Sequence, residues 1–194
     1  MSESREEKRT RLVAVAIEVL GRHGVKKTNL DDIARAAGMA TTSLYYYFPN
    51  KNELVRAALS ATVDALLARI EEVVHSSRDP EAKLVESWKI LFRTIRRTGL
   101  LLDLDATTKS EVLHLAQDLV EDYQRRYTAF MLEVLEEGQS KGVFRIKHPE
   151  TTALVLSVGI VGLLVNTAGQ TQFDLLEQQI DEIGELLMNG LRRR

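Results

Sequence analysis

The sequence of 194 residues contains no cysteine, which excludes a disulfide framework and a metal site built from thiolates. It also lacks the roughly 18 to 20 consecutive apolar residues that a membrane-spanning helix requires. The longest apolar run, residues 153–165, is shorter and contains Ser157 and two glycines. No charged segment followed by an apolar one stands near Met1, as a secretory signal would. We therefore expect a soluble cytoplasmic protein with no membrane partner.

The sequence motifs of common enzyme classes are missing as well. There is no G-x-S-x-G elbow, no H-E-x-x-H, no P-loop and no Rossmann glycine fingerprint. The pair His114 and Asp118 and the D-x-D of Asp103 and Asp105 are fragments at most, and a solvated surface pair is the commoner explanation of each. We expect no enzymatic activity, no metal and no cofactor, and a helical enzyme is the least favoured alternative.

Charge is divided unevenly along a chain whose formal net charge is −2. Residues 1–60 hold ten Lys or Arg against seven Asp or Glu, a balance of +3, and residues 61–194 hold sixteen against twenty-one, a balance of −5. Arg5, Lys8, Arg9 and Arg11 form a basic arm that suits phosphate or minor-groove contacts. A solvated helix end explains each of them equally well.

The spacing of apolar residues predicts an all-α fold of about nine helices in two domains. Residues 1–49 form the expected N-terminal three-helix domain, and residues 50–194 form the expected C-terminal helical domain. A short extended segment is expected at residues 143–146. The predicted helices span residues 5–22, 30–37, 41–47, 50–76, 80–98, 100–108, 110–137, 149–168 and 173–191.

Residues 30–47 have the pattern of a helix-turn-helix. The first helix has an apolar face that includes Leu30 and Ile33, Gly38 permits a sharp turn, and Leu44 with Phe48 forms the i, i+4 apolar pair of the second helix. Thr28 stands where an N-cap residue is expected, three residues before Asp31.

Four consecutive aromatic residues, Tyr45, Tyr46, Tyr47 and Phe48, follow in the second helix. Because a helix turns by roughly 100° per residue, these side chains sweep about 300° and cannot all face a core. At least one or two must point outward, where they need a partner.

The small polar residues of the second helix indicate what this partner is. A helix over residues 41–47 would be about 10 Å long and would fit a major groove about 12 Å wide. The hydroxyls of Thr41, Thr42 and Ser43 suit base edges and phosphates, and Lys51 suits a phosphate. The segment therefore predicts binding to double-stranded DNA.

Residues 28–54 resemble the DNA-binding motif of the TetR-type transcriptional repressors. The resemblance is carried by I-A-x-x-A-G at residues 33–38, L-Y-x-Y-F at residues 44–48 and K-x-E-L at residues 51–54. It implies groove contacts by Thr41, Thr42, Tyr45 and Tyr46 and backbone contacts by Thr28, Tyr47 and Lys51. Many members have Ser or Thr at the position of Ala40 as a helix cap, so here the cap moves to Thr41 or is lost.

The last two helices predict a homodimer. One short recognition helix reads too few bases for useful specificity, whereas a two-fold dimer reads the two halves of a palindromic operator. Small residues let helices pack closely, and the resemblance implies an interface of four helices. The alternative is that both helices pack only within their own chain. The expected interface residues are Ser157, Gly162, Leu176, Ile180, Ile183 and Leu187.

By the same resemblance, the middle helices would bind a small, largely apolar effector. Aromatic residues with polar tips are the usual lining of ligand sites, although each of them, taken alone, is more often ordinary core. A polar residue in the apolar helix 149–168 suits either a ligand contact or a buried hydrogen bond. The expected effector-binding residues are Trp88, Phe92, Tyr123, Tyr127, Phe130 and Asn166.

Together these expectations describe a sequence-specific repressor that its effector releases from the operator. The main alternative is a sequence-neutral architectural protein, which would bind random and operator DNA equally at fixed salt.

Overall fold

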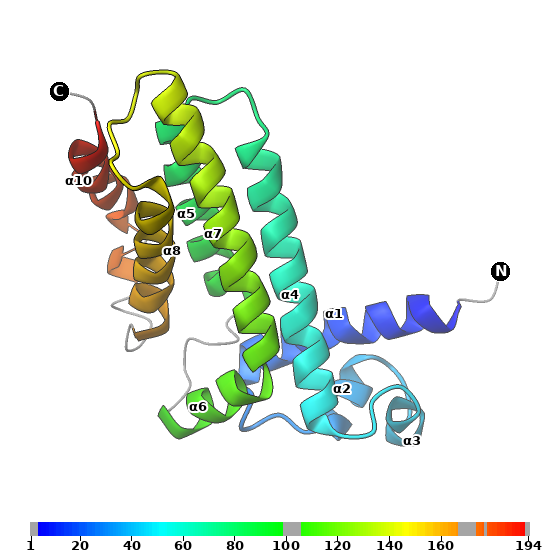
Figure 1. Ribbon diagram of the computed structural model, residues 1–194. Helices are drawn as coiled ribbons and strands as arrows, with labels where there is room; N and C mark the ends of the chain where they lie inside the picture. Colours follow the sequence, from blue (N-terminus) through cyan, green and yellow to red (C-terminus); the bar gives the residue numbers. More distant parts are fainter. Residues whose placement is uncertain (1–3, 99–105, 167–173, 177, 193–194) are drawn as a thin grey trace. The chain divides into compact units, whose positions relative to one another are not determined.

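The segments whose apolar residues have helical spacing are α-helices in the structure (Figure 1). The computed structural model describes residues 4–98, 106–166, 174–176 and 178–192, with only the backbone of residues 106, 109 and 164–166. Within these ranges all regular elements are helices. They are α1 (Arg5–His23), α2 (Leu30–Ala36), α3 (Thr41–Tyr45), α4 (Lys51–Val74), α5 (Pro80–Thr98), α6 (Ala106–Leu115), α7 (Gln117–Ser140), α8 (Pro149–Asn166) and α10 (Ile180–Leu191). The all-α prediction is confirmed, and none of the described helices has the length and apolar character to cross a membrane.

The chain divides into two compact units, here called the head unit and the bundle unit. The head unit comprises residues 1–64 and 95–120, and the bundle unit comprises residues 65–94 and 121–194. The divisions fall within α4, within α5 and within α7. The predicted boundary between residues 49 and 50 stays a prediction, since the head unit continues past it and takes in α6.

Capping fixes where the first two helices begin. Ser4 and Glu7 form a capping box at the start of α1, and Gly24 ends that helix with φ 80°. At α2 a second capping box joins Asn29 and Asp32. The prediction that Thr28 caps this helix is wrong. Asn29 takes that position because its side chain reaches the amide of Asp32, three residues ahead.

Helix α3 is shorter than predicted, because it covers Thr41–Tyr45 and its C-cap is Tyr46. At about 1.5 Å per residue it is roughly 7.5 Å long. Its N-cap is Ala40, which makes no side-chain hydrogen bond. Of the two outcomes expected at this position, the cap is therefore lost rather than moved to Thr41.

The head unit has a core to which α1, α2, α3, α4 and α6 contribute. Its largest fully buried side chains include Leu12 and Leu20 of α1, Ile33 of α2, Leu44 of α3 and Leu54 of α4. Val112 of α6 and Ala116 join the same core. Since burial of each large apolar side chain contributes about 1.5–3 kcal/mol, α3 keeps its place through this core rather than through its own length.

The predicted single helix over residues 110–137 is wrong, because the chain turns at Ala116 between α6 and α7. Arg56 of α4 holds this break. Its guanidinium donates to the Leu115 carbonyl at 3.0 Å and forms two hydrogen bonds with the Asp118 carboxylate. A carbonyl that accepts from a distant arginine can leave the helical ladder without becoming unpaired.

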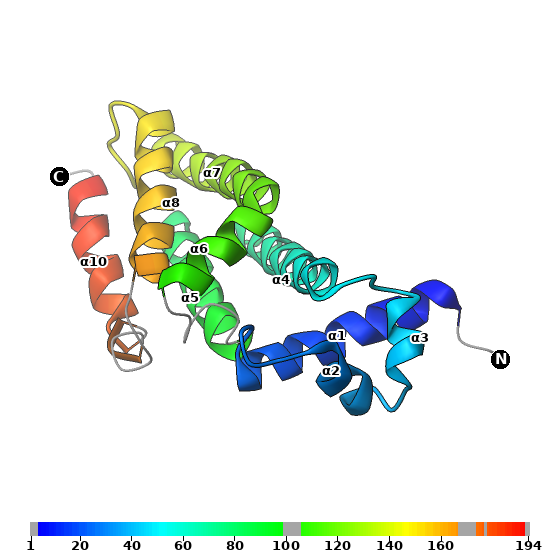
Figure 2. The same ribbon diagram turned by 90° about the horizontal axis from the view of Figure 1, so that it is seen from below.

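The bundle unit contains α8, α10, most of α5 and α7 and the C-terminal part of α4, and Figures 1 and 2 both place α8 between α7 and α10. Close approaches fix its packing. A Cβ on Gly138 would lie 2.1 Å from the Phe144 ring, and one on Gly184 would lie 2.9 Å from Val85. In the predicted extended segment, Phe144 forms an isolated antiparallel bridge with Arg192, which follows α10.

The final helix differs from the prediction. Residues 174–176 are helical, but α10 begins at Ile180 after a turn at Gln179, which has φ −98° and ψ 7°. The predicted helix over 173–191 is therefore interrupted. Three predicted helix ends lie outside the described residues. They are the start of the last helix at residue 173, the start of the helix predicted over 100–108, and the end of α8 at residue 168.

Candidate functional site

The recognition helix α3 presents a continuous polar and aromatic surface. Leu44 and Phe48 are buried, and the residues between and directly before them are exposed or half-buried. The exposed fraction is 51% for Tyr45 and 65% for Tyr46. Thr42 and Ser43 are exposed, and Thr41 and Tyr47 are half-buried. The prediction that one or two of the four aromatic side chains point outward is confirmed.

Two arginines of the N-terminal arm lie against this aromatic run. The Arg5 guanidinium carbon is 4.8 Å from the centre of the Tyr46 ring, and that of Arg9 is 5.1 Å from the centre of the Phe48 ring. Tyr46 and Tyr47 pack edge to face at 5.2 Å. Cation–π contacts of this kind contribute about 0.5–1 kcal/mol at exposed positions. They bring positive charge to the same surface as the exposed tyrosines (Figure 2 shows α1 beside α3).

Lys51 begins α4 and is half-buried. Asn50 caps this helix by accepting a hydrogen bond from the Glu53 amide at 2.9 Å. Partial burial lowers the pKa of the Lys51 ammonium, because removal from water disfavours the charged form. A phosphate beside Lys51 would oppose this effect.

Thr28 does not lie on this surface. Its side chain is 2% exposed, and its hydroxyl donates to the Gly24 carbonyl at 2.8 Å. The structure thus places seven of the eight predicted DNA-binding residues at or near the head surface and turns Thr28 inward, where it closes the loop between α1 and α2. The contacts of Arg5 and Arg9 with aromatic rings were missed, because sequence spacing does not show which side of α1 meets α3.

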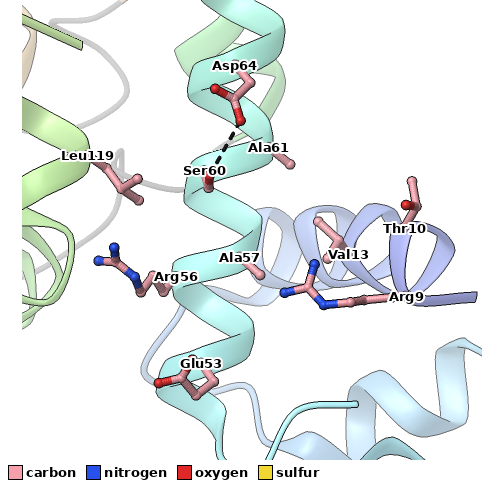
Figure 3. A pocket seen from close by; sticks show the side chains of 10 residues that line it. All are labelled: Arg9, Thr10, Val13, Glu53, Arg56, Ala57, Ser60, Ala61, Asp64 and Leu119. Atoms are coloured by element: carbon pink, nitrogen blue, oxygen red, sulfur yellow. Dashed lines mark hydrogen bonds between the residues drawn. The ribbon is translucent and has the colours of Figure 1, made fainter. Parts of the chain in front are cut away.

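A shallow cleft of about 330 Å³ lies between α1 and α4 of the head unit (Figure 3). Arg9 of α1 points toward α4, whereas the side chain of Arg56 points to the other side of α4, and Glu53 and Asp64 also line the cleft. The charges of the two signs balance, and Arg56 is held by Asp118. This hydrogen bond keeps the pKa of the Asp118 carboxyl below its ordinary value. The cleft therefore has no excess of charge that would select an ionic ligand.

Residues 12–58 match the family model of bacterial regulatory proteins of the tetR family. The transcriptional repressor KstR2 of Mycolicibacterium smegmatis is 27% identical over 139 residues, which cover 71% of this chain and 68% of KstR2. A regulator of the TetR/AcrR family from Thermobifida fusca has 26% identity and a TM-score of 0.69, with 96% of this chain and 100% of that chain covered. A transcriptional regulator from Cytophaga hutchinsonii shares the fold, with a TM-score of 0.76, 18% identity and coverage of 94% and 97%.

The chain belongs to the TetR family. It is a DNA-binding transcriptional regulator, and these relatives are regulators rather than enzymes. Of the two candidate metal fragments, the Asp118 carboxylate is held by Arg56, and Asp103 and Asp105 lie outside the described residues.

In this TetR-family protein the predicted effector residues lie in the bundle unit. Trp88, Phe92 and Tyr127 are fully buried, Tyr123 is 7% exposed and Phe130 is half-buried. The rings of Tyr123 and Tyr127 stack at 5.4 Å, with 14° between their planes. Burial raises the pKa of both hydroxyls above the ordinary value. The side chain of Asn166 lies outside the described part of the chain.

The predicted dimer residues of this TetR-family protein fall on both sides of their helices. Ser157 is fully buried and bonded to Gln124 at 2.9 Å and to Thr128 at 2.8 Å. Ile180 is 4% exposed. Gly162, Leu176, Ile183 and Leu187 are half-buried. Ser157 and Ile180 therefore pack within their own chain. This agrees with the alternative to a dimer interface for these two residues.

The most exposed apolar side chains of α8 and α10 were not predicted. The exposed fraction is 49% for Leu154, 63% for Val155, 50% for Val158 and 73% for Leu186. On α8, apolar residues occur on all sides, so periodicity cannot show which side faces the core.

Proposed function

We propose that this protein is a repressor that binds a palindromic operator as a homodimer and is released by a small, largely apolar effector. It acts in the cytoplasm, where a bacterial regulator meets DNA, and it has no catalytic role. The observation that carries the proposal is the exposed surface of α3, where Thr42, Ser43, Tyr45 and Tyr46 project from a helix held by Leu44 and Phe48.

Thr42, Ser43, Tyr45 and Tyr46 are the proposed groove contacts, with Thr41 beside them. Tyr47 and Lys51 are the proposed phosphate contacts, together with the arm residues Arg5 and Arg9. The side chain of Thr28 is not retained, because its hydroxyl proton already bonds within the head. Hydroxyls and aromatic rings suit base edges and thymine methyls, and the cations suit phosphates.

A second copy of the chain is the proposed occupant of the exposed apolar side of α8. Leu154, Val155 and Val158 share this side with Gly159, where an added Cβ would meet no atom within 4 Å. A glycine with open space and exposed branched side chains beside it allow close helix approach. The requirement for two half-sites supports the same occupant, because a helix of about 7.5 Å reads few bases.

Effector release requires that the ligand bind the DNA-bound and DNA-released states with different affinities. The buried aromatic residues of α5 and α7 are the proposed effector contacts. Since α4, α5 and α7 each continue from one unit into the other, a change among these aromatic side chains has a continuous path to the head.

The test is selection of bound duplexes from a random-sequence pool at two salt concentrations. The proposal predicts recovery of a two-fold palindrome at both. Binding that enriches no sequence and declines steeply with salt would support the architectural alternative instead. Absence of binding would overturn the proposal.

The dimer is tested separately by sedimentation. Val155→Glu should give monomers and weaken operator binding, because it places a charge in the proposed interface. Ala68→Glu, at an exposed position of α4, is the matched control and should remain dimeric. A dimer that survives both Val155→Glu and Val158→Glu would contradict this interface.

A further inference from the structure

Among the described residues of the bundle unit, three aromatic side chains each bury a polar atom that makes no hydrogen bond: the Trp88 Nε1, the Tyr123 hydroxyl and the Tyr127 hydroxyl. Trp88 and Tyr127 are fully buried, and Tyr123 is 7% exposed. Buried polar groups in folded proteins are nearly always hydrogen-bonded, because burial removes their bonds to water. Three such groups together call for an explanation.

The three groups belong to one cluster. Tyr123 and Tyr127 are one turn apart on α7 and stack. The Tyr127 hydroxyl lies beside Ser87 and the Trp88 indole of α5, and both partly offset the rise of its pKa, but neither contact has the distance and angles of a hydrogen bond. The Ser87 hydroxyl donates to the Leu84 carbonyl at 2.7 Å, so its proton is committed. From the other side, a Cβ on Gly184 would be 3.8 Å from the Trp88 ring, so α10 covers the indole.

Other polar side chains of the same unit are paired. Gln124, Thr128 and Ser157 bond to one another at 2.8–3.1 Å. Lys83, one turn before Ser87 on α5, is buried and paired with Glu137 at 2.6 Å. Glu137 also binds Lys141 at 2.6 Å. The buried cation near the cluster is therefore already neutralised.

We propose that Trp88, Tyr123 and Tyr127 recognise the effector through an uncharged oxygen acceptor, such as a ketone carbonyl, on an otherwise apolar molecule. An indole N–H donates and cannot accept, and a phenol can donate. Their donors are neutral, so they suit a carbonyl. A carboxylate would lose its hydration here without gaining a cation, which is costly. This inference rests on the proposed function in one respect, namely that these side chains form the effector site.

Ligand chemistry is tested with three probes of similar shape: 4-phenyl-2-butanone, butylbenzene and 3-phenylpropanoate. Trp88 is the single tryptophan of the sequence, so a change in its emission locates binding, and calorimetry gives the affinity. The ketone should bind about tenfold more tightly than the hydrocarbon, and the carboxylate should bind most weakly. Equal affinities, a preference for the carboxylate, or no binding of any probe up to its solubility limit would overturn the proposal.

Two variants assign the preference to the cluster. Tyr123→Phe and Tyr127→Phe should reduce ketone affinity by about fivefold each and leave butylbenzene affinity unchanged. Thr128→Val, which alters the paired network instead, is the control and should keep the ketone preference. A ketone preference that survives both Tyr→Phe changes would contradict the assignment.

A measurement without ligand tests the same claim. Removing a hydroxyl that has no partner should leave Tm unchanged or raise it, whereas Thr128→Val should lower Tm by about 2–4 °C. If both Tyr→Phe changes lower Tm as much as Thr128→Val, the hydroxyls are bonded within the protein and the proposal fails.

Operator binding separates this inference from the proposed function. If the protein binds an operator but no probe binds near Trp88, the inference fails and the DNA-binding function stands. If no operator is found but the ketone preference and the Tm results hold, the proposed function fails and the recognition chemistry of the cluster stands.

Discussion

The two compact units of this protein use tyrosine in opposite ways. In the head unit, Tyr45 and Tyr46 are 51% and 65% exposed. In the bundle unit, Tyr123 and Tyr127 are buried. Spacing produces the difference, because consecutive tyrosines on a short helix cannot share one face, whereas tyrosines four residues apart on a long helix do. The phenol is thus exposed in one unit, where we propose that it contacts DNA, and buried in the other, where we propose that it contacts a ligand.

The largest expected effect is on the free energy of unfolding, when one tyrosine ring is removed from each unit. Tyr127→Ala should cost about 3–5 kcal/mol of unfolding free energy, because it leaves a large cavity. Tyr46→Ala should cost about 1 kcal/mol or less, since it loses an exposed contact with Arg5, yet it should weaken operator binding. Chemical denaturation and operator titration measure the two quantities.

Phe48→Ala is the control within the head unit. Phe48 is 1% exposed, so its loss should also be about 3–5 kcal/mol. Equal losses for Tyr46→Ala and Phe48→Ala would show that the ring of Tyr46 is not a surface group.

A second prediction separates reading of bases from attachment to the backbone. Thr42→Ala should reduce discrimination between operator and random DNA by about 1–3 kcal/mol if Thr42 contacts a base. Lys51→Ala should weaken binding to both DNAs alike and lower the salt slope by about one. Affinities of both variants for operator and random DNA, measured at several salt concentrations, distinguish base reading from backbone attachment. The same loss on both DNAs for Thr42→Ala would remove it from the base-reading residues.

A third prediction concerns the caps of the two helices of the motif. Asn29→Ala should destabilise the head unit by about 1 kcal/mol, because it removes the capping box of α2. Ala40→Ser should stabilise it by about 0.5–1 kcal/mol, because it gives α3 the side-chain cap that it lacks. Thermal unfolding measures both. A neutral Asn29→Ala would show that tertiary packing alone sets the start of α2.

The smallest expected effect is a pH dependence of DNA affinity. Partial burial lowers the pKa of Lys51 in the free protein, and a phosphate contact would raise it again. Affinity should therefore be fullest below the free-protein pKa and decline as the pH rises through it. Operator titrations from about pH 7 to about pH 10 should show a steeper decline for the natural protein than for Lys51→Arg, which stays charged. Parallel declines would exclude this lysine as the source.

Much of the head could be predicted from local signals. The turn at Gly38, the burial of Leu44 and Phe48 and the exposure of Tyr45 and Tyr46 follow from spacing over a few residues. The inward position of Thr28 could not be predicted, because Thr28 and Asn29 are both good caps, and which of them caps α2 depends on the path of the loop after Gly24.

Fewer details of the bundle unit could be predicted. The aromatic residues of α5 and α7 were predicted as a site, but the shortage of partners around Trp88, Tyr123 and Tyr127 depends on where three helices meet. Ser157 was predicted from the sequence as a dimer contact, but it is buried within its own chain. The exposed side of the same helix carries Leu154, Val155 and Val158.

The sequence by itself determined the all-helical architecture, the helix-turn-helix and the outward tyrosines, because periodicity, turn residues and helix geometry act over short distances. Tertiary structure decided the break at Ala116, where Arg56 from a distant helix binds the Leu115 carbonyl and Asp118. It also decided which side of α8 is buried. Both depend on a partner remote in sequence, which a local pattern does not specify.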